Sequence, residues 1–211
     1  MLEIEIEEDI RLERLNHTHA QGIFNLINSN REYLRKWLTF VDSTRNLKDT
    51  EDYISYIEKS SANPNSEVVI AILIKDNLMG IMGIKKVDWA NRIAEIGYWL
   101  GEEYQGRGII TKSCRAILDY AFGQMGVNRV EIKCGVGNER SCHVPQRLGF
   151  TFEGIERDGE LVNGQYIDLE VYSLLRREWH AIGSFAIKKQ SEKENDKYKN
   201  LKVRASLTKP Y

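Results

Sequence analysis

The segment Glu103-Tyr-Gln-Gly-Arg-Gly-Ile109 decides how this chain is organised. It lies between a strand expected over residues 94–100 and a helix expected over residues 110–125, as the periods of the apolar side chains indicate. Two glycines in such a turn leave backbone N–H groups unshielded, and the helix N-terminus adds a partial positive charge. The segment therefore predicts a pyrophosphate site, although a Gly-x-Gly turn alone is as compatible with a plain tight turn. It lacks the third glycine of a dinucleotide fingerprint and the Gly-Lys-Ser/Thr of a Walker A loop.

Apolar periodicity predicts the elements on both sides of this segment. Residues 139–148 indicate a short helix that Pro145 interrupts, and Asn163-Gly164 is a hairpin turn. A helix beginning at Ala20 could be capped by Thr18. The alternation of strands and helices predicts a mixed α/β sheet. The remaining elements are a hairpin or strand over residues 2–15, helices over 30–37 and 48–60, a breaker at 63–65, and strands over 68–75, 78–86, 130–136, 150–156 and 166–175.

Composition limits the class of protein. The chain has 211 residues, of which 42% are hydrophobic and 29% charged, values ordinary for a globular domain. It has no run of 18 apolar residues, and its acidic opening is the reverse of a secretory leader. Its three cysteines form no Cys-x-x-Cys pair, which argues against a disulfide framework or a zinc site. We expect a cytoplasmic protein that binds neither a membrane nor a metal.

Two stretches together carry a family resemblance. The loop at residues 103–109 and the block Asn138-Glu-Arg-Ser-Cys-His-Val-Pro-Gln-Arg-Leu-Gly-Phe150 resemble the two CoA-contacting motifs of the GNAT superfamily of N-acetyltransferases. Glu103 stands where that family usually has Gln or Arg. The likeness covers about residues 2–180. Three stretches, residues 30–38, 94–100 and 104–111, make it closest to bacterial ribosomal-protein serine/alanine N-terminal acetyltransferases. It implies a mixed, mostly antiparallel central sheet with splayed central strands, flanked by helices.

The resemblance also implies where acetyl-CoA binds as co-substrate. Backbone amides of the loop would hold the pyrophosphate, and the strand before it would contact the pantetheine arm. The second motif would add Asn138 and Ser141. The cofactor-binding residues expected in this way are Ile96, Tyr98, Trp99, Leu100, Gln105, Gly106, Arg107, Gly108, Ile109, Thr111, Asn138 and Ser141.

Acetylation of an amine needs a base for the ammonium and a proton for the leaving thiolate. By resemblance, Glu160 is the expected base, directly or through water, and Glu95 is the second candidate. The alternative for each is a solvated surface acid, and the motif match disfavours it more for Glu160 than for Glu95. Ser141 is expected to protonate the thiolate, or else to serve with Asn138 in capping a helix. Cys142 and His143 are an alternative nucleophile and base, but successive helix residues point about 100° apart. Cys114 and Cys134 have the apolar spacing of packed residues.

The predicted function is transfer of acetyl from acetyl-CoA to an amine, namely the N-terminal α-amino group of a ribosomal protein. The alternatives are a small-amine acetyltransferase, acting on a polyamine or an aminoglycoside, and a CoA-binding module without catalysis. By resemblance, Tyr33, Trp37 and Trp89 are candidates for the walls of the acceptor groove, and packing at the edge of the core is the alternative for each. A homodimer is implied by resemblance alone. Acidic residues gather in the segments expected near the acceptor: Glu102, Glu103, Glu153, Glu156, Asp158, Glu160, Asp168 and Glu170.

The formal net charge of −1 conceals two unlike parts. Residues 184–211 hold eight bases and three acids, a net charge of +5, so residues 1–183 carry −6. We expect residues 1–183 to form the acetyltransferase domain. The tail at 184–211 has few apolar residues and is expected to be disordered. A sharper hypothesis is that this basic tail associates with the ribosome through its RNA.

Overall fold

The computed structural model describes residues 3–7, 10–60 and 67–181. The chain divides into two units, Met1–Leu174 and Leu175–Tyr211. In the second unit, residues 176–181 are helical, and the Glu178 carboxylate accepts a hydrogen bond from the Leu175 N–H at 2.9 Å. The expected domain boundary after residue 183, the basic tail and the breaker at 63–65 lie outside the described residues.

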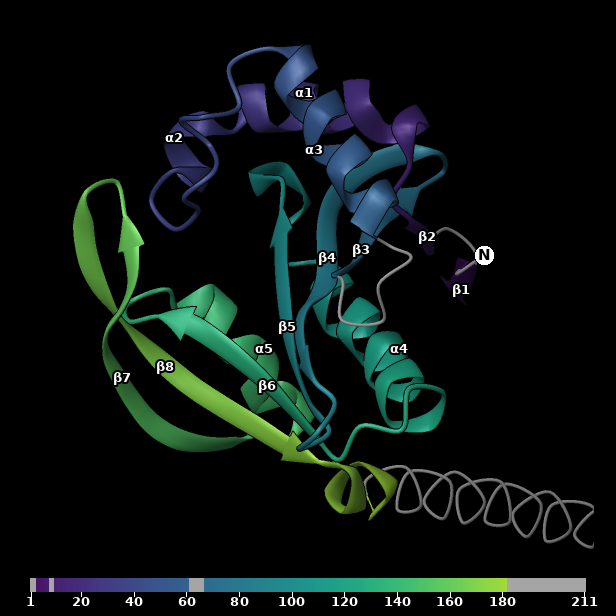
Figure 1. The fold of residues 1–211 in the computed structure, drawn as a ribbon, viewed down its shortest axis with the longest axis vertical. Coiled ribbons are helices and arrows are strands. Elements are labelled where there is room, and N and C mark those ends of the chain that lie inside the picture. The colour runs from purple at the N-terminus through teal and green to yellow at the C-terminus, as the bar shows by residue number, and fades with distance from the viewer. Residues whose placement is uncertain (1–2, 8–9, 61–66, 182–211) are drawn as a thin grey trace, which may run out of the picture. The chain divides into compact units, whose positions relative to one another are not determined.

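An eight-stranded sheet forms the centre of the first unit (Figure 1). Neighbouring strands from β1 to β5 pair antiparallel, as do β7 and β8, whereas β5 and β6 are parallel. This confirms the mixed, mostly antiparallel sheet. The strands are β1 (Glu3–Glu7), β2 (Ile10–Arg14), β3 (Val68–Ile74), β4 (Asn77–Asp88), β5 (Ile93–Leu100), β6 (Arg129–Gly135), β7 (Thr151–Val162) and β8 (Gln165–Leu175), in the order β1-β2-β3-β4-β5-β6-β8-β7.

The two central strands part in the middle of the sheet. β5 and β6 are paired only over Ile93–Glu95 and Arg129–Glu131. Beyond that point the two strands diverge, as Figure 1 shows. Since each backbone group must still find a partner, the facing edges of Ile96–Leu100 and Ile132–Gly135 offer N–H and C=O groups to a ligand. The splayed centre expected from the family resemblance is present.

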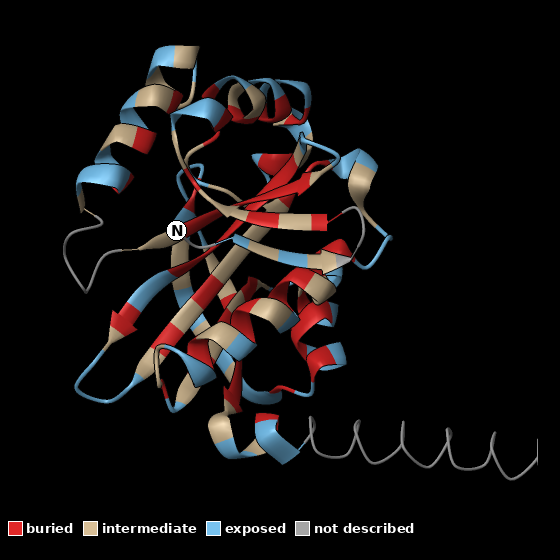
Figure 2. Cartoon of the chain, turned by 90° about the vertical axis from the view of Figure 1, so that its right-hand side faces the viewer, coloured by how far each residue is buried: buried red, intermediate tan, exposed pale blue. Residues whose placement is uncertain are grey.

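Helices cover both faces of this sheet (Figure 2). Val69, Ala71 and Leu73 of β3 share one face and belong to a core cluster with residues of α1 and α3. Ile70 and Ile72, on the other face, are also buried, and α4 contacts β1, β5 and β6. The helices are η1 (His17–His19), α1 (Ala20–Ser29), α2 (Arg31–Leu34), α3 (Leu47–Ser60), η2 (Glu102–Tyr104), α4 (Ile109–Gly123) and α5 (Glu139–Leu148).

Two local expectations were wrong. Thr18 does not cap α1, because a 3-10 turn precedes that helix and Asn16 caps the turn, its side chain accepting from the Thr18 N–H at 2.9 Å. Pro145 does not interrupt α5, which continues through it to Leu148. A proline removes one helical hydrogen bond, the one to the carbonyl four residues earlier, and that carbonyl belongs to Ser141.

Glycine is required where β4 and β5 approach each other. A Cβ on Gly80 would lie 2.2 Å from the carbonyl oxygen of Trp99 and 2.9 Å from the Cα of Leu100. Because both contacts are backbone, Gly80→Ala can be accommodated only by moving the strands apart. We expect it to lower the free energy of unfolding by about 3 kcal/mol.

The matched control is Gly123→Ala at the exposed end of α4, where an added Cβ meets nothing within 4 Å. This change should leave stability unchanged or raise it by about 0.5–1 kcal/mol. Urea unfolding of both variants measures the difference. Equal stabilities would contradict the close approach of the two strands at Gly80.

Candidate active site

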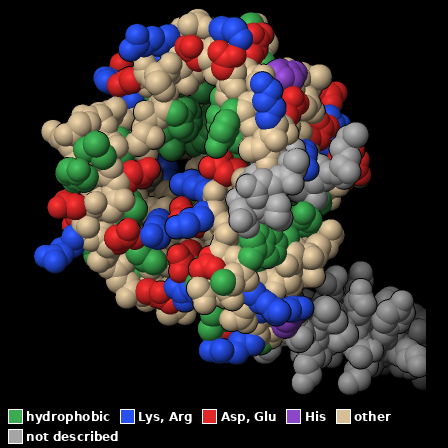
Figure 3. Space-filling view, viewed as in Figure 1, with side chains coloured by type: hydrophobic (Ala, Val, Ile, Leu, Met, Phe, Trp, Pro, Cys, Tyr) green, Lys and Arg blue, Asp and Glu red, His purple; other side chains and the backbone are tan. Residues whose placement is uncertain are grey.

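Two cavities meet where β5 and β6 diverge. The wedge cavity, about 340 Å³, lies between the two strands and reaches Glu67 and Glu160. The cradle cavity, about 770 Å³, follows residues 104–112 at the start of α4. Figure 3 shows a hollow at the centre of the face turned to the viewer, with acidic and basic side chains around it. Both cavities share six lining residues: Trp37, Leu38, Tyr98, Trp99, Asn138 and Ser141.

The cradle cavity has the properties of an anion site. Gly106 and Gly108 adopt positive φ angles of 73° and 72°, and Gly108 is the N-cap of α4, which has no side-chain cap. The first N–H groups of this 15-residue helix therefore remain for a ligand. The basic side chains lining the cavity are Arg107, Lys112, Arg140 and Arg147. These groups fit the pyrophosphate of acetyl-CoA.

Glu103, which replaces the usual Gln or Arg of the family motif, does not place its acidic side chain in this site. Glu103 does not line the cradle cavity, and its backbone carbonyl accepts a hydrogen bond from the Arg107 guanidinium at 3.2 Å. Glu102 does line it, and its N–H donates at 2.8 Å to the side chain of buried Asn30. Asn30 thus fixes the loop from the C-terminal end of α1, a role that sequence reasoning missed because 72 residues separate the two partners.

Tyr98 and Ser141, which line both cavities, form a small polar cluster with Cys134 of the wedge cavity. The Tyr98 hydroxyl donates at 3.0 Å to the Ser141 carbonyl, the group that Pro145 leaves without a helical partner. The Ser141 hydroxyl lies 3.3 Å from the Cys134 sulfur and 3.5 Å from the Tyr98 oxygen. Because Pro145 removes a helical hydrogen bond, the Ser141 carbonyl is free to accept one from Tyr98, which links α5 to β5 beside both cavities.

Burial keeps the neighbours of Ser141 protonated at neutral pH. It raises the pKa of the Tyr98 phenol well above its ordinary value and raises the pKa of the Cys134 thiol. It also raises the pKa of the Cys114 and Cys142 thiols. Because a thiolate is the reactive form, a cysteine nucleophile at Cys142 is disfavoured. Asn138 accepts a hydrogen bond from the Ser141 N–H at 3.4 Å, so the capping interpretation also holds for this pair.

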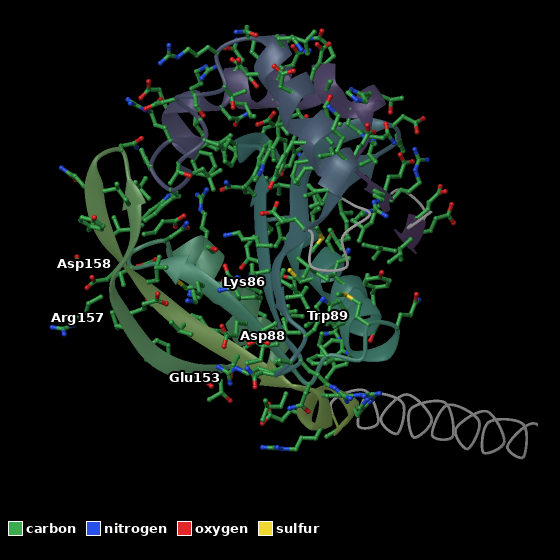
Figure 4. All side chains as sticks on the ribbon, in the orientation of Figure 1. Lys86, Asp88, Trp89, Glu153, Arg157 and Asp158 are labelled. Atoms are coloured by element: carbon green, nitrogen blue, oxygen red, sulfur yellow. The ribbon has the colours of Figure 1, made fainter. Side chains whose placement is uncertain are left out.

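The wedge cavity receives Glu160 from a distorted part of β7. Between Glu156 and Glu160 the register with β8 shifts, and Asp158 has a φ of 52°. The Asp168 carboxylate accepts from the Asp158 N–H at 2.9 Å and so stabilises this bulge. Figure 4 shows Arg157 and Asp158 at the bend of the hairpin, on its outer side. A bulge re-aims the side chains that follow it, and Glu160 comes to line the cavity.

Glu95 is placed differently. Glu95 is the last residue at which β5 pairs with β6, and it lines neither cavity. It forms an ion pair with Lys85 at 3.6 Å. Trp89 follows the end of β4 (Figure 4) and lines neither cavity. Trp37 lines both cavities, and Tyr33 lines the cradle cavity.

The structure brings the expected cofactor-binding residues together around the two cavities. Ile96 lines the wedge cavity. The cradle cavity is lined by the other eleven, namely Tyr98, Trp99, Leu100, Gln105, Gly106, Arg107, Gly108, Ile109, Thr111, Asn138 and Ser141.

The expected acidic surface is partly neutralised. Arg129 on β6 donates two hydrogen bonds to Glu153 on β7, and Ser173 of β8 donates a third at 2.6 Å. The bonds from Arg129 contribute most, and together with the bond from Ser173 they lower the pKa of Glu153 to about 2. Lys133 bonds Glu156 at 2.5 Å. Glu67 also lines the wedge cavity, but it belongs to no motif, so no pattern in the sequence marks it as a site residue.

Across residues 3–7, 10–60 and 67–181, the structure contains no group of three or more His, Cys, Asp or Glu that could hold a metal ion. Within the same ranges, no helix is both long and apolar enough to span a membrane.

Comparison with known proteins agrees with this geometry. A model of the acetyltransferase (GNAT) domain matches residues 9–151. A Bacillus subtilis (strain 168) relative, whose name assigns it provisionally as a ribosomal N-acetyltransferase, is 40% identical over 181 residues, covering 85% of this chain and 98% of the relative. The ribosomal-protein-serine acetyltransferase of Escherichia coli (strain K12) is 30% identical over 175 residues, covering 81% and 94%. A solved ribosomal L7/L12 alpha-N-protein acetyltransferase in complex with coenzyme A has a TM-score of 0.78 at 25% identity, covering 82% and 98%.

Proposed function

This chain belongs to the GNAT acetyltransferase family and is an acetyl-CoA-dependent N-acetyltransferase, and we propose that its acceptor is the N-terminal α-amino group of a ribosomal protein. One observation carries the proposal. The cradle cavity and the wedge cavity, which contains a carboxylate, share a wall that includes Ser141. Two substrates can therefore approach one point from opposite sides, as direct transfer requires.

The chemistry of the acceptor also favours an α-amino group. Its pKa of about 7.7–8.0 leaves roughly a tenth of such groups neutral at pH 7, against fewer than one in a thousand for a lysine-like amine. A carboxylate near the acceptor can therefore assist an α-amino group, directly or through water, more readily than it can assist a lysine-like amine.

Three groups of residues have distinct roles in this proposal. The amides of Gly106 to Thr111 hold the pyrophosphate, and the free edge of Ile96–Leu100 holds the pantetheine arm. Glu160 accepts the proton that the ammonium loses, so that the neutral nitrogen attacks the thioester carbonyl. When the C–S bond breaks, the sulfur takes a proton from the Ser141 hydroxyl, and the second proton that the nitrogen loses on becoming an amide restores that hydroxyl. Tyr98 positions Ser141 through its hydrogen bond to the Ser141 carbonyl.

An acceptor screen tests the proposal. Thiol release from acetyl-CoA is measured with short peptides bearing a free N-terminal Ser or Ala, with spermidine, and with an aminoglycoside. We expect kcat/KM for the peptides to exceed that for the small amines by at least about 10-fold, because a peptide also fills the apolar part of the wedge cavity.

The same peptides with an acetylated N-terminus are the control and should release no thiol. Release with spermidine alone would instead identify a small-amine acetyltransferase. Tight acetyl-CoA binding with no release for any amine would identify a binding module. Ribosome association through the basic tail and homodimer formation stay predictions, and the tail lies outside the described residues.

A further inference from the structure

Glu67 lies beside an irregularity at one end of the wedge cavity. It immediately precedes β3, and Val68 pairs with Ile84 of β4. The next residue of β4, Lys85, is skipped in the pairing with β5, where the register passes from Ile84 to Lys86. This bulge places Glu67 and Lys85 together at the cavity wall. Burial is the main cause that raises the pKa of the half-buried Glu67 carboxyl.

The two lysines that line this cavity have their ion-pair partners outside it. Four charged residues line it: Glu67, Lys85, Lys133 and Glu160. Both lysines have carboxylate partners that do not line the cavity, Glu95 for Lys85 and Glu156 for Lys133. The side-chain carboxylates of Glu67 and Glu160 form no hydrogen bond and no ion pair within 4.0 Å with any residue in the described ranges, although the charge of Lys85 acts on Glu67. Two carboxylates are therefore left for a ligand, and a partly desolvated carboxylate favours a cation.

The two carboxylates serve different parts of an acceptor. Glu160 comes from β7 and Glu67 from the start of β3, which lie on opposite sides of the wedge in the strand order. Glu67 lines only the wedge cavity, together with Tyr53, Phe40, Val69 and Ile81, and none of these reaches the cradle cavity. This end is therefore removed from the transfer point at Ser141. Its apolar walls suit the alkyl stem of a long basic side chain.

Tyr53 completes this end of the cavity. Burial and then the charge of Glu67 raise the pKa of the Tyr53 phenol to about 12, so the hydroxyl stays protonated and neutral beside the carboxylate. The charge of Lys85 also acts on Glu67 and lowers its pKa against the larger effect of burial, but the ion-pair partner of the Lys85 ammonium is Glu95, at 3.6 Å.

We propose that Glu67 forms a second cation-binding subsite, which takes a Lys or Arg side chain near the N-terminus of the acceptor peptide. This inference rests on the proposed function, since it assumes a peptide whose α-amino group is the one acetylated. It assigns to Glu67 the selection of the acceptor and leaves the proton transfer to Glu160.

The test compares serine-initiated peptides that carry Lys, Ala or Glu at the second, third or fourth position. For the best-placed lysine, the wild-type enzyme should show kcat/KM about 10-fold above that of the alanine peptide. Glu67→Gln should abolish this preference by raising KM for the lysine peptide about 10-fold, with kcat within twofold. The alanine peptide should be unaffected.

Glu5→Gln is the matched control, because Glu5 is an exposed acid on edge strand β1 that lines neither cavity, and it should keep the preference. The unfolding temperature of each variant shows that it is folded. Survival of the preference in Glu67→Gln, or an equal fall in kcat for all peptides, would overturn the subsite. If the wild type acetylates some peptides without any preference for lysine, only the subsite fails. If it acetylates none of them, the proposed function fails as well.

Discussion

Glu160→Gln is expected to lower turnover by about 10²–10⁴ at neutral pH with little change in acetyl-CoA affinity. The amide has nearly the shape of the carboxylate but cannot take a proton from the attacking ammonium. Glu160 lines the wedge cavity and not the cradle cavity, so binding of the pyrophosphate should be preserved. Steady-state kcat with a peptide acceptor and calorimetric titration with acetyl-CoA measure the two quantities separately.

Glu95→Gln is the natural control for this experiment. It makes the same chemical change on β5, but Glu95 is paired with Lys85 and lines neither cavity. Its turnover should stay within a few-fold of wild type. The residual rate of Glu160→Gln should rise with pH as more of the acceptor amine becomes neutral. Turnover near the wild-type value in Glu160→Gln would assign the base to Glu95 or to water.

Gly106→Asp is expected to raise the Kd for acetyl-CoA by about 100-fold. The backbone at Gly106 has a φ of 73°, a region that Asp and Asn tolerate better than other side chains, and an added Cβ there meets nothing within 4 Å. The new carboxylate would therefore fit, but beside the position of the pyrophosphate. Like charges a few ångströms apart repel by about 4 kcal/mol near a protein surface before salt screening, which is more than a 100-fold loss requires.

Gly106→Asn separates charge from backbone strain, because it imposes the same φ without the charge. We expect its Kd to lie within about 10-fold of the wild-type value. Raising the salt concentration should narrow the gap between the two variants. Equal Kd values for Asp and Asn at low salt would show that the pyrophosphate does not bind at this loop.

The sequence predicted best those features that neighbouring residues determine. The turn at Gly106 and Gly108 and the type of each long element follow from glycine conformation and apolar periodicity, and the structure confirms these elements. The predicted interruption of α5 at Pro145 was wrong because it too was inferred from neighbouring residues alone. A proline usually breaks a helix, but here the Tyr98 hydroxyl satisfies the carbonyl that loses its partner. Tyr98 lies 43 residues away in sequence.

Features that depend on distant pairing could not be predicted. The importance of Glu67 arises because the partners of Lys85 and Lys133 lie outside the wedge cavity, which no single segment reveals. The acidic residues expected to attract an acceptor illustrate the same limit. Glu153 and Glu156 are acids in the sequence, yet Arg129 and Lys133 neutralise them across the sheet. A net charge counted along the chain does not show which charges remain unpaired.

The early end of the pairing between β5 and β6 has a thermodynamic consequence. A sheet that leaves two central strand edges open has fewer internal hydrogen bonds than its length allows, and a ligand in the opening supplies the missing partners. A ligand that binds only the folded chain adds about 2.7 kcal/mol to its stability at a concentration 100 times the Kd. The resistance of this enzyme to unfolding is therefore coupled to its supply of co-substrate, so the same opening that admits acetyl-CoA makes the folded population depend on its concentration.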